Sequence, residues 1–214
     1  MAPDRLDRGA GVGEQYFSAR PTSGRARRTI RLRLPDLTLE LASDRGVFAA
    51  DRVDAGTLTL LRRGEQAVPD GDVADVGCGY GPIALTLARR NPAATVWAVD
   101  VNERARALCA ENAARHGIGN VRVVAPEEVP DDLRLAAWWS NPPVHVGKAV
   151  LHALLVDWLE RLTPAAAAHL VVHKHLGSDS LARWLTAQGW EATRRSSHDG
   201  YRLLDVARAS PGDR

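Results

Sequence analysis

A loop in which three glycines alternate with other residues, 77–81, constrains the fold of this chain more strongly than any other stretch. The segment before it, 72–76, has a β-branched bias, and the segment after it, 83–90, has the apolar spacing of a helix. Glycine adopts positive φ and lets the backbone approach a ligand. Pro82 suits the first turn of a helix, where its missing N–H would have no partner. This order of strand, glycine loop and helix is typical of a nucleotide site in an α/β fold.

The spacing within the glycine loop narrows the choice of ligand. A dinucleotide fingerprint reads G-x-G-x-x-G, whereas here the third glycine comes one residue earlier. Asp75, two residues before the loop, would lie badly beside a pyrophosphate but well beside a cationic or zwitterionic ligand. Asp100 follows the predicted strand 95–99, where a doubly wound fold places an acceptor for ribose hydroxyls. These carboxylates predict S-adenosylmethionine as the cofactor and disfavour NAD, and a turn that serves only helix–sheet packing is the alternative.

From residue 72 onward, predicted strands alternate with predicted helices. Strands are expected at 72–76, 95–99, 120–124, 135–140 and 168–173, and helices at about 83–90, 102–117, 148–162 and 178–188. Two last strands, 190–196 and 201–207, are joined by an Asp-Gly turn and predict an antiparallel pair. Helices between strands imply parallel pairing. The predicted fold class is therefore α/β, with a doubly wound, mostly parallel, Rossmann-like seven-stranded sheet whose last strand is antiparallel. A short β-hairpin, 30–34 with 37–41, precedes it.

The chain is long enough for one substantial core and is expected to form one domain. The expected division is a disordered tail at 1–13, a single domain at 14–207 and a tail at 208–214, the domain comprising an N-terminal hairpin and helix (14–65) and the core (66–207). No apolar run approaches the roughly 20 residues that a membrane-spanning helix needs, and residues 1–8 lack a signal-peptide pattern. Cys78 and Cys109 are expected to be reduced packing residues. Together these features predict a cytoplasmic protein.

A second informative turn, Asn141-Pro142-Pro143, follows the predicted strand 135–140. Ligands collect at the carboxyl ends of parallel strands, so this turn should share one rim with Asp75 and Asp100. An aromatic exocyclic amine is a poor nucleophile because its lone pair is delocalised into the ring. The side-chain oxygen of Asn141 and the carbonyl of Pro142 can accept both N–H bonds of such an amine and aim its lone pair at a methyl donor. An isolated Asn-Pro pair is usually only a turn, but its position after the fourth strand favours a catalytic role.

As a set, Asp75-x-Gly77-x-Gly79-x-Gly81, Asp100 and Ser140-Asn141-Pro142-Pro143 resemble the class I S-adenosylmethionine-dependent methyltransferases. More narrowly, they resemble the methyltransferase small domain family, which includes ribosomal small-subunit RNA guanine-N2 methyltransferases. The resemblance covers roughly residues 14–207. It implies an enzyme that methylates the exocyclic amine of a guanine in ribosomal RNA. It also implies RNA or the small ribosomal subunit as the partner, and a monomer or homodimer.

The resemblance also assigns site residues. It implies cofactor contacts for Asp75, Gly77, Cys78, Gly79, Gly81, Asp100, Val101, Glu127 and Phe48, and catalytic roles for Asn141 and Pro142. No metal ligand is expected. Family members usually carry Phe or Tyr directly after the second proline, to stack on the target base, whereas this chain has Val144 and then His145. The candidate substrate contacts are therefore Pro143, His145, Tyr16 and Phe17.

Two groups of basic residues leave alternatives open. Arg20, Arg25, Arg27, Arg28, Arg31 and Arg33 fall within fourteen residues that contain no acidic residue. Such a cluster either follows RNA phosphates or forms a solvated strand face. His169, His173 and His175 alternate along the predicted strand 168–173 and its exit, and are expected to pack at a sheet edge.

Other functions remain possible from the sequence alone. One is methyl transfer to a protein glutamine amide or a small-molecule amine. Another is a non-catalytic RNA-binding module that holds the cofactor.

Overall fold

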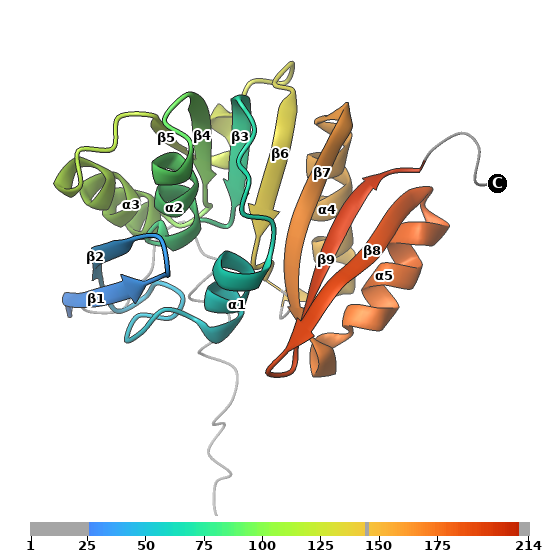
Figure 1. Ribbon diagram of the computed structural model, residues 1–214, viewed down its shortest axis with the longest axis horizontal. Helices are drawn as coiled ribbons and strands as arrows, with labels where there is room; N and C mark the ends of the chain where they lie inside the picture. Colours follow the sequence, from blue (N-terminus) through green and yellow to red (C-terminus); the bar gives the residue numbers. More distant parts are fainter. Residues whose placement is uncertain (1–25, 144–145, 210–214) are drawn as a thin grey trace, which may run out of the picture.

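The computed structural model describes residues 26–143 and 146–209 (Figure 1). The strands are β1 (Arg28–Arg33), β2 (Thr38–Ser43), β3 (Gly71–Val76), β4 (Ala94–Val99), β5 (Val121–Val124), β6 (Leu135–Ser140), β7 (Leu162–His173), β8 (Trp190–His198) and β9 (Tyr201–Arg208). The helices are α1 (Ala55–Arg63), α2 (Pro82–Arg90), α3 (Glu103–Arg115), α4 (Lys148–Glu160) and α5 (Ser178–Ala187), with short 3-10 turns η1 (Pro126–Glu128) and η3 (Lys174–Leu176). None of the helices in the described part of the chain is long and apolar enough to cross a membrane.

The main sheet has seven strands in the order β5-β4-β3-β6-β7-β9-β8. Strands β3 to β7 pair in parallel, and β9 runs antiparallel to both of its neighbours, β7 and β8. The predicted doubly wound, mostly parallel sheet with an antiparallel last strand is therefore confirmed. The strand order reverses between β3 and β6, and this switch point is where open α/β sheets leave a crevice at their carboxyl edge.

Helices cover both faces of the sheet, which explains why its central strands are mostly apolar. Consecutive side chains on a strand point to opposite faces, and the fully buried pair Trp138 and Trp139 illustrates this. Trp138 belongs to the core beneath α4 and α5. Trp139 belongs to the core that α2, α3 and the β1–β2 hairpin share. The two tryptophans thus anchor β6 to both layers directly before the Asn-Pro-Pro turn.

The N-terminal hairpin is the antiparallel pair β1–β2, as predicted. Asn112 of α3, fully buried, joins this hairpin to the glycine loop. Its side-chain oxygen accepts the N–H of Ala42 (2.7 Å), and its side-chain nitrogen donates to the carbonyls of Ala42 and Tyr80 (2.9 Å each). Figure 1 shows the hairpin beside α3, and α1 in front of the arrowhead end of β6. The N-terminal segment is therefore placed over the carboxyl edge of the sheet.

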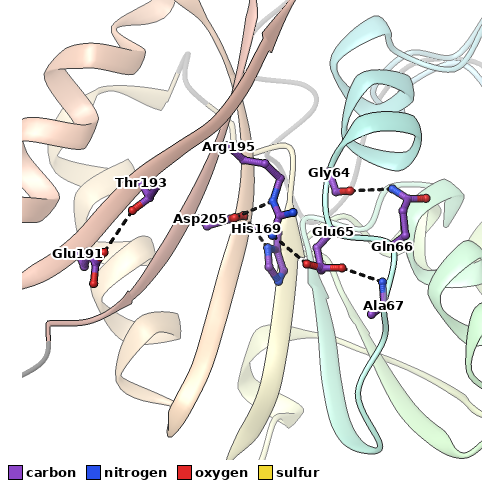
Figure 2. A network of polar contacts seen from close by, with 9 residues as sticks. All are labelled: Gly64, Glu65, Gln66, Ala67, His169, Glu191, Thr193, Arg195 and Asp205. Atoms are coloured by element: carbon purple, nitrogen blue, oxygen red, sulfur yellow. Dashed lines mark hydrogen bonds and ion pairs between the residues drawn. The ribbon is translucent and has the colours of Figure 1, made fainter.

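The expectation that the histidines of β7 pack at a sheet edge is wrong. This strand lies between β6 and β9, and His169 is buried. Its Nδ1 lies 2.8 Å from Asp205 Oδ1, and its ring lies 4.8 Å from that of Trp139. Figure 2 shows the network continuing outward, because Arg195 bonds to Asp205 (2.7 Å) and to Glu65 (2.8 Å). His169 is therefore part of a polar connection between the core strands and the segment after α1.

Candidate active site

The carboxyl ends of β3, β4 and β6 lie side by side, because these strands are neighbours in the sheet. Asp100 directly follows β4, and Asn141 directly follows β6. Ser140 ties the ends of β6 and β3 together by donating its hydroxyl to the carbonyl of Val76 (2.6 Å). The start of the Asn-Pro-Pro turn is thereby held next to the start of the glycine loop.

A pocket opens at this edge, and three segments that are distant in sequence contribute to it. One is the stretch before and within the first turn of α1, the second is the glycine loop with the start of α2, and the third is the Asn-Pro-Pro turn. The lining residues are Phe48, Ala49, Asp54, Thr57, Gly77, Cys78, Gly79, Tyr80, Pro82, Ile83 and Asn141. The two turns singled out in the sequence thus meet at one cavity.

The glycines of the loop have two different structural roles. Gly77 and Gly79 have positive φ (80° and 56°), and a Cβ added at either would meet no atom within 4 Å. Their backbone therefore faces open space at the pocket, which fits the cradle that an adenosine cofactor requires. Gly81 also has positive φ (97°), but a Cβ there would lie 2.7 Å from the sulfur of Cys109. Gly81 is needed where α2 packs against α3.

Both cysteines are free and buried, as expected for packing residues. The hydrogen bond to Cys109, together with burial, raises the pKa of the Cys78 thiol well above its usual value. Cys78 also lines the pocket. A protonated thiol there presents the cavity with a small, weakly polar wall.

The carboxylate of Asp100 shapes the rim beside the glycine loop. One oxygen accepts the N–H of Gly79 and the other accepts the N–H of Asn102, each at 2.8 Å. Burial raises the pKa of this carboxyl, and these two hydrogen bonds act in the opposite direction. Val101 beside it is 42% exposed. Neither residue is among those that line the pocket, so their contacts with a cofactor stay predictions.

Asp75 lies beneath the glycine loop and not on the pocket surface. Its side chain is fully buried, one oxygen accepts the N–H of Ala84 (2.9 Å), and the other has no hydrogen-bond partner in the described structure. Burial raises the pKa of Asp75 to about 8, and the charge of Asp100 adds to this effect. Asp75 thus caps the first turn of α2, a role that the sequence did not suggest. Its predicted contact with the cofactor has no counterpart among the pocket-lining residues.

The side-chain amide of Asn141 is held by the first turn of α1. Its nitrogen donates to Asp54 Oδ1 (2.7 Å) and to the hydroxyl of Thr57 (3.1 Å). Asp54 is also the N-cap of α1, because the same oxygen accepts the N–H of Thr57 (3.1 Å). A carboxylate only accepts hydrogen bonds. The amide nitrogen of Asn141 therefore faces α1, and its oxygen remains to accept a hydrogen bond from a ligand.

The remaining candidate residues lie around this centre or outside the described residues. Phe48 is 51% exposed at the pocket. Glu127 is exposed in η1, after the end of β5. Pro142 is buried and Pro143 is half-buried, and both follow Asn141 directly in the chain. Tyr16, Phe17, Val144 and His145 fall outside the described residues.

Among the pocket residues that the sequence did not assign to the site, three carry polar side chains: Asp54, Thr57 and Tyr80. The hydroxyl of Tyr80 is buried without a hydrogen-bond partner in the described structure. Burial and the charge of Asp54 raise the pKa of this hydroxyl. Nothing in the local sequence connects Asp54 or Thr57 to Asn141.

Three of the four described arginines of the N-terminal cluster form ion pairs within the protein. Arg27 bonds to Glu111 (2.8 Å), Arg28 to Asp51 (3.0 Å), and Arg31 to Glu40. The pairs are exposed and contribute little to stability. They favour the solvated strand face over a row of arginines that follows RNA phosphates. Arg20 and Arg25 lie outside the described residues.

Comparison with known proteins agrees with this geometry. The uncharacterized protein YbxB of Bacillus subtilis is 33% identical over 196 residues, which cover 90% of this chain and 98% of that protein. Ribosomal RNA large subunit methyltransferase G of Shewanella baltica is 31% identical over 67% of this chain, and ribosomal RNA small subunit methyltransferase C of Pseudomonas putida is 35% identical over 63% of it. The matched part spans only 40% of each of these two relatives.

The fold is shared with a solved T. thermophilus 16S rRNA N2 methyltransferase in complex with AdoMet and guanosine. The TM-score is 0.72 at 24% sequence identity, over 86% of this chain and 51% of that one. Residues 38–204, most of the chain, match the family described as Methyltransferase small domain. This chain therefore belongs to the methyltransferase small domain family of S-adenosylmethionine-dependent methyltransferases.

Proposed function

We propose that this protein transfers the methyl group of S-adenosylmethionine to the exocyclic amine of a guanine in ribosomal RNA. One observation carries the proposal: Asn141 of the Asn-Pro-Pro turn and Gly77 and Gly79 of the glycine loop line the same pocket. The cofactor supplies an electrophilic methyl group. The open backbone of the loop and the acceptor oxygen of Asn141 bring donor and amine within one cavity.

The Asn-Pro-Pro turn acts by orienting the substrate amine. The amide oxygen of Asn141 and the backbone carbonyl of Pro142 accept the two N–H bonds of the amine, and its lone pair turns toward the methyl group. Two successive prolines fix φ and keep both acceptors stationary. Ideal placement of two reactants contributes about 7–11 kcal/mol to lowering a barrier, so no strong base is needed. The surplus proton leaves to water after the nitrogen becomes cationic.

The choice of RNA as the substrate rests on the relatives. Two of them are named as ribosomal RNA methyltransferases, and the solved relative was crystallised with guanosine. This chain matches about half or less of their lengths. The part that selects the nucleotide in those longer proteins can therefore differ here, and the assay must compare several acceptors.

Methyl transfer from tritiated S-adenosylmethionine tests the proposal. The acceptors are total ribosomal RNA, intact ribosomal subunits and ribosomal proteins, all from cells that lack this protein. We expect label in RNA with the wild-type protein. Asn141→Ala should lower the rate by at least about 100-fold, the usual cost of one lost polar contact to a transition state.

The affinity for S-adenosylhomocysteine, measured by calorimetry, should stay within about twofold of wild type, because Asn141 orients the acceptor and not the donor. Unchanged transfer by Asn141→Ala refutes its assigned role. Label in a ribosomal protein, for example on a glutamine side chain, and not in RNA, refutes the substrate.

A further inference from the structure

Asp54 and Thr57 use every hydrogen of the Asn141 amide nitrogen. One hydrogen points to Asp54 Oδ1 and the other to the Thr57 hydroxyl, at donor–acceptor distances of 2.7 and 3.1 Å. Asp54 and Asn141 are 87 positions apart in the sequence. Asp54 Oδ1 also caps α1 by accepting the N–H of Thr57. The same oxygen therefore has two roles, one at the helix end and one at Asn141 in the pocket.

An asparagine side chain without such contacts can rotate about its last torsion between two amide orientations of similar energy. In one orientation it offers an oxygen to the pocket, and in the other it offers an NH2 group. An NH2 group would repel the N–H bonds of an amine substrate. The side-chain oxygen of Asp54 selects the first orientation, because a carboxylate oxygen only accepts hydrogen bonds and therefore pairs only with the nitrogen side of the amide.

We propose that Asp54 and Thr57 are positioning residues that lock the Asn141 amide with its oxygen presented to the substrate amine. This inference rests on the proposed function. The carboxylate also polarises the amide, because hydrogen bonds in a chain strengthen one another. The oxygen of Asn141 is thereby a better acceptor for an amine whose nitrogen gains positive charge during transfer.

The first turn of α1 is itself held in place from the sheet. A Cβ added at Gly56 would lie 2.7 Å from the ring of Tyr201 and 2.9 Å from Asp54 Oδ1. Tyr201, at the start of β9, therefore packs directly on the first turn of α1, which carries Asp54 and Thr57. Thr57 is buried and Asp54 is half-buried. Tyr201 therefore supports the turn that contains Asp54 and Thr57 from the side of the sheet.

Three substitutions distinguish the two roles of this turn, which are orienting the Asn141 amide (the lock, formed by Asp54 and Thr57) and capping α1. Asp54→Ser keeps a good N-cap residue, but its short side chain withdraws the oxygen from Asn141. Asp54→Asn can keep an acceptor oxygen in the same place without the charge. Thr57→Val keeps the β-branched shape and removes the second acceptor. Asp51→Ser, in the same segment but exposed and paired with Arg28, is the matched control.

The first readout is methyl transfer to total ribosomal RNA with tritiated S-adenosylmethionine. Asp54→Ser should lower kcat by about 100-fold, the cost of a misplaced reactive group, with KM for the cofactor and the melting temperature nearly unchanged. Thr57→Val should lower kcat by about 10-fold, since one of the two contacts remains. Asp54→Asn should recover most of the wild-type rate, and Asp51→Ser should match wild type.

The second readout needs no substrate. The side-chain amide of Asn141 can be assigned in a ¹⁵N correlation spectrum by its disappearance in Asn141→Asp. Its hydrogens should exchange slowly with solvent in wild type and Asp54→Asn, and at least about 10-fold faster in Asp54→Ser, because exchange requires the hydrogen bonds to open.

The two readouts distinguish failure of the lock from failure of the proposed function. If Asn141→Ala is inactive while Asp54→Ser keeps full activity and slow amide exchange, the lock is refuted and the proposed function stands. If Asn141→Ala stays active, the proposed role of Asn141 fails. The exchange measurement then decides separately whether Asp54 holds the amide.

Discussion

The carboxyl group of Asp75 shows how a single buried residue can make stability depend on pH. Its pKa is raised from an ordinary value near 3.8 to about 8, chiefly by burial. The folded protein therefore binds a proton at Asp75 that the unfolded chain has already released between these two pH values. Stability contributed by this group is full below about pH 4 and is lost as the pH rises toward 8.

Asp75→Asn should remove this dependence. The amide oxygen of the variant can still accept the N–H of Ala84, and the side chain cannot ionise. Relative to wild type, its free energy of unfolding should rise between pH 5 and 8 by up to about 1.4 kcal/mol per pH unit. Urea unfolding at four pH values measures the difference. The exposed Asp132→Asn serves as the control, and a difference that is constant with pH would show that Asp75 titrates normally.

Substitutions at two glycines of the loop should have different effects, one mainly on stability and the other mainly on ligand binding. Gly81→Ala places a methyl group against Cys109 at an unfavourable φ, and should lower the free energy of unfolding by about 2 kcal/mol or more. Gly79→Ala has φ 56° and open space, so its folding cost should be about 1 kcal/mol. Its methyl group would instead occupy the pocket side and weaken S-adenosylhomocysteine binding by about 10-fold. Equal losses of stability in the two variants would contradict this division.

At the scale of elements, the sequence predicted those with a local signal. The Asp199-Gly200 turn adopts positive φ at both residues (47° and 82°), as a two-residue hairpin requires. The helix predicted to end at Gly117 ends at Arg115, and Gly117 takes the left-handed conformation that follows a helix. These outcomes depend on residues that are adjacent in sequence.

The sequence predicted only the second half of β7, residues 168–173, because the first half has no local strand signal. Leu162–Ala167 contains Pro164 and three alanines, which have no strand pattern. It joins the sheet because the β6–β7 register shifts between Leu135 and Ala137, and such an irregularity tolerates a proline. Pairing with a neighbouring strand decided the structure here, and pairing is not visible in a single segment.

The network around Arg195 gives a prediction for the packing between elements. Burial raises the pKa of Asp205, but the hydrogen bonds and charges of His169 and Arg195 outweigh it and hold the pKa below its usual value. The stabilisation is therefore present above about pH 4 and is lost as the pH falls further. Arg195→Met should lower the free energy of unfolding at pH 7 by about 1 kcal/mol, a modest value because Arg195 is partly exposed.

Thermal unfolding at pH 7 and pH 3.5 measures this effect. The difference from wild type should shrink at the lower pH, because the unfolded chain begins to bind protons at these carboxyl groups there, while the ion pairs with Arg195 keep the folded ones ionised to lower pH. The neighbouring exposed Arg194→Met is the matched control and should change little. A loss that is equal at both pH values would assign the effect to packing of the arginine stem.

At the scale of the whole molecule, the site is an assembly of distant segments. The glycine loop and the Asn-Pro-Pro turn were identifiable because each follows a predicted strand, and strand ends meet at one edge. Asp54 was not, because its connection to Asn141 spans 87 positions and depends on how the N-terminal segment folds over the sheet. Asp75 was placed at the correct edge, but its burial depends on the glycine loop above it.

Because the pocket is built from all three segments, a ligand bound there should stabilise the entire fold. A ligand present at 100 times its dissociation constant adds about 2.7 kcal/mol to the free energy of unfolding. For a chain of this size, that raises the melting temperature by about 5–10 °C. Differential scanning fluorimetry should show this shift with S-adenosylhomocysteine and none with NADH, since the third glycine comes too early for a dinucleotide. Asp54→Ser should keep the shift, because the lock acts on the acceptor side. An equal shift with NADH would assign the pocket to a dinucleotide.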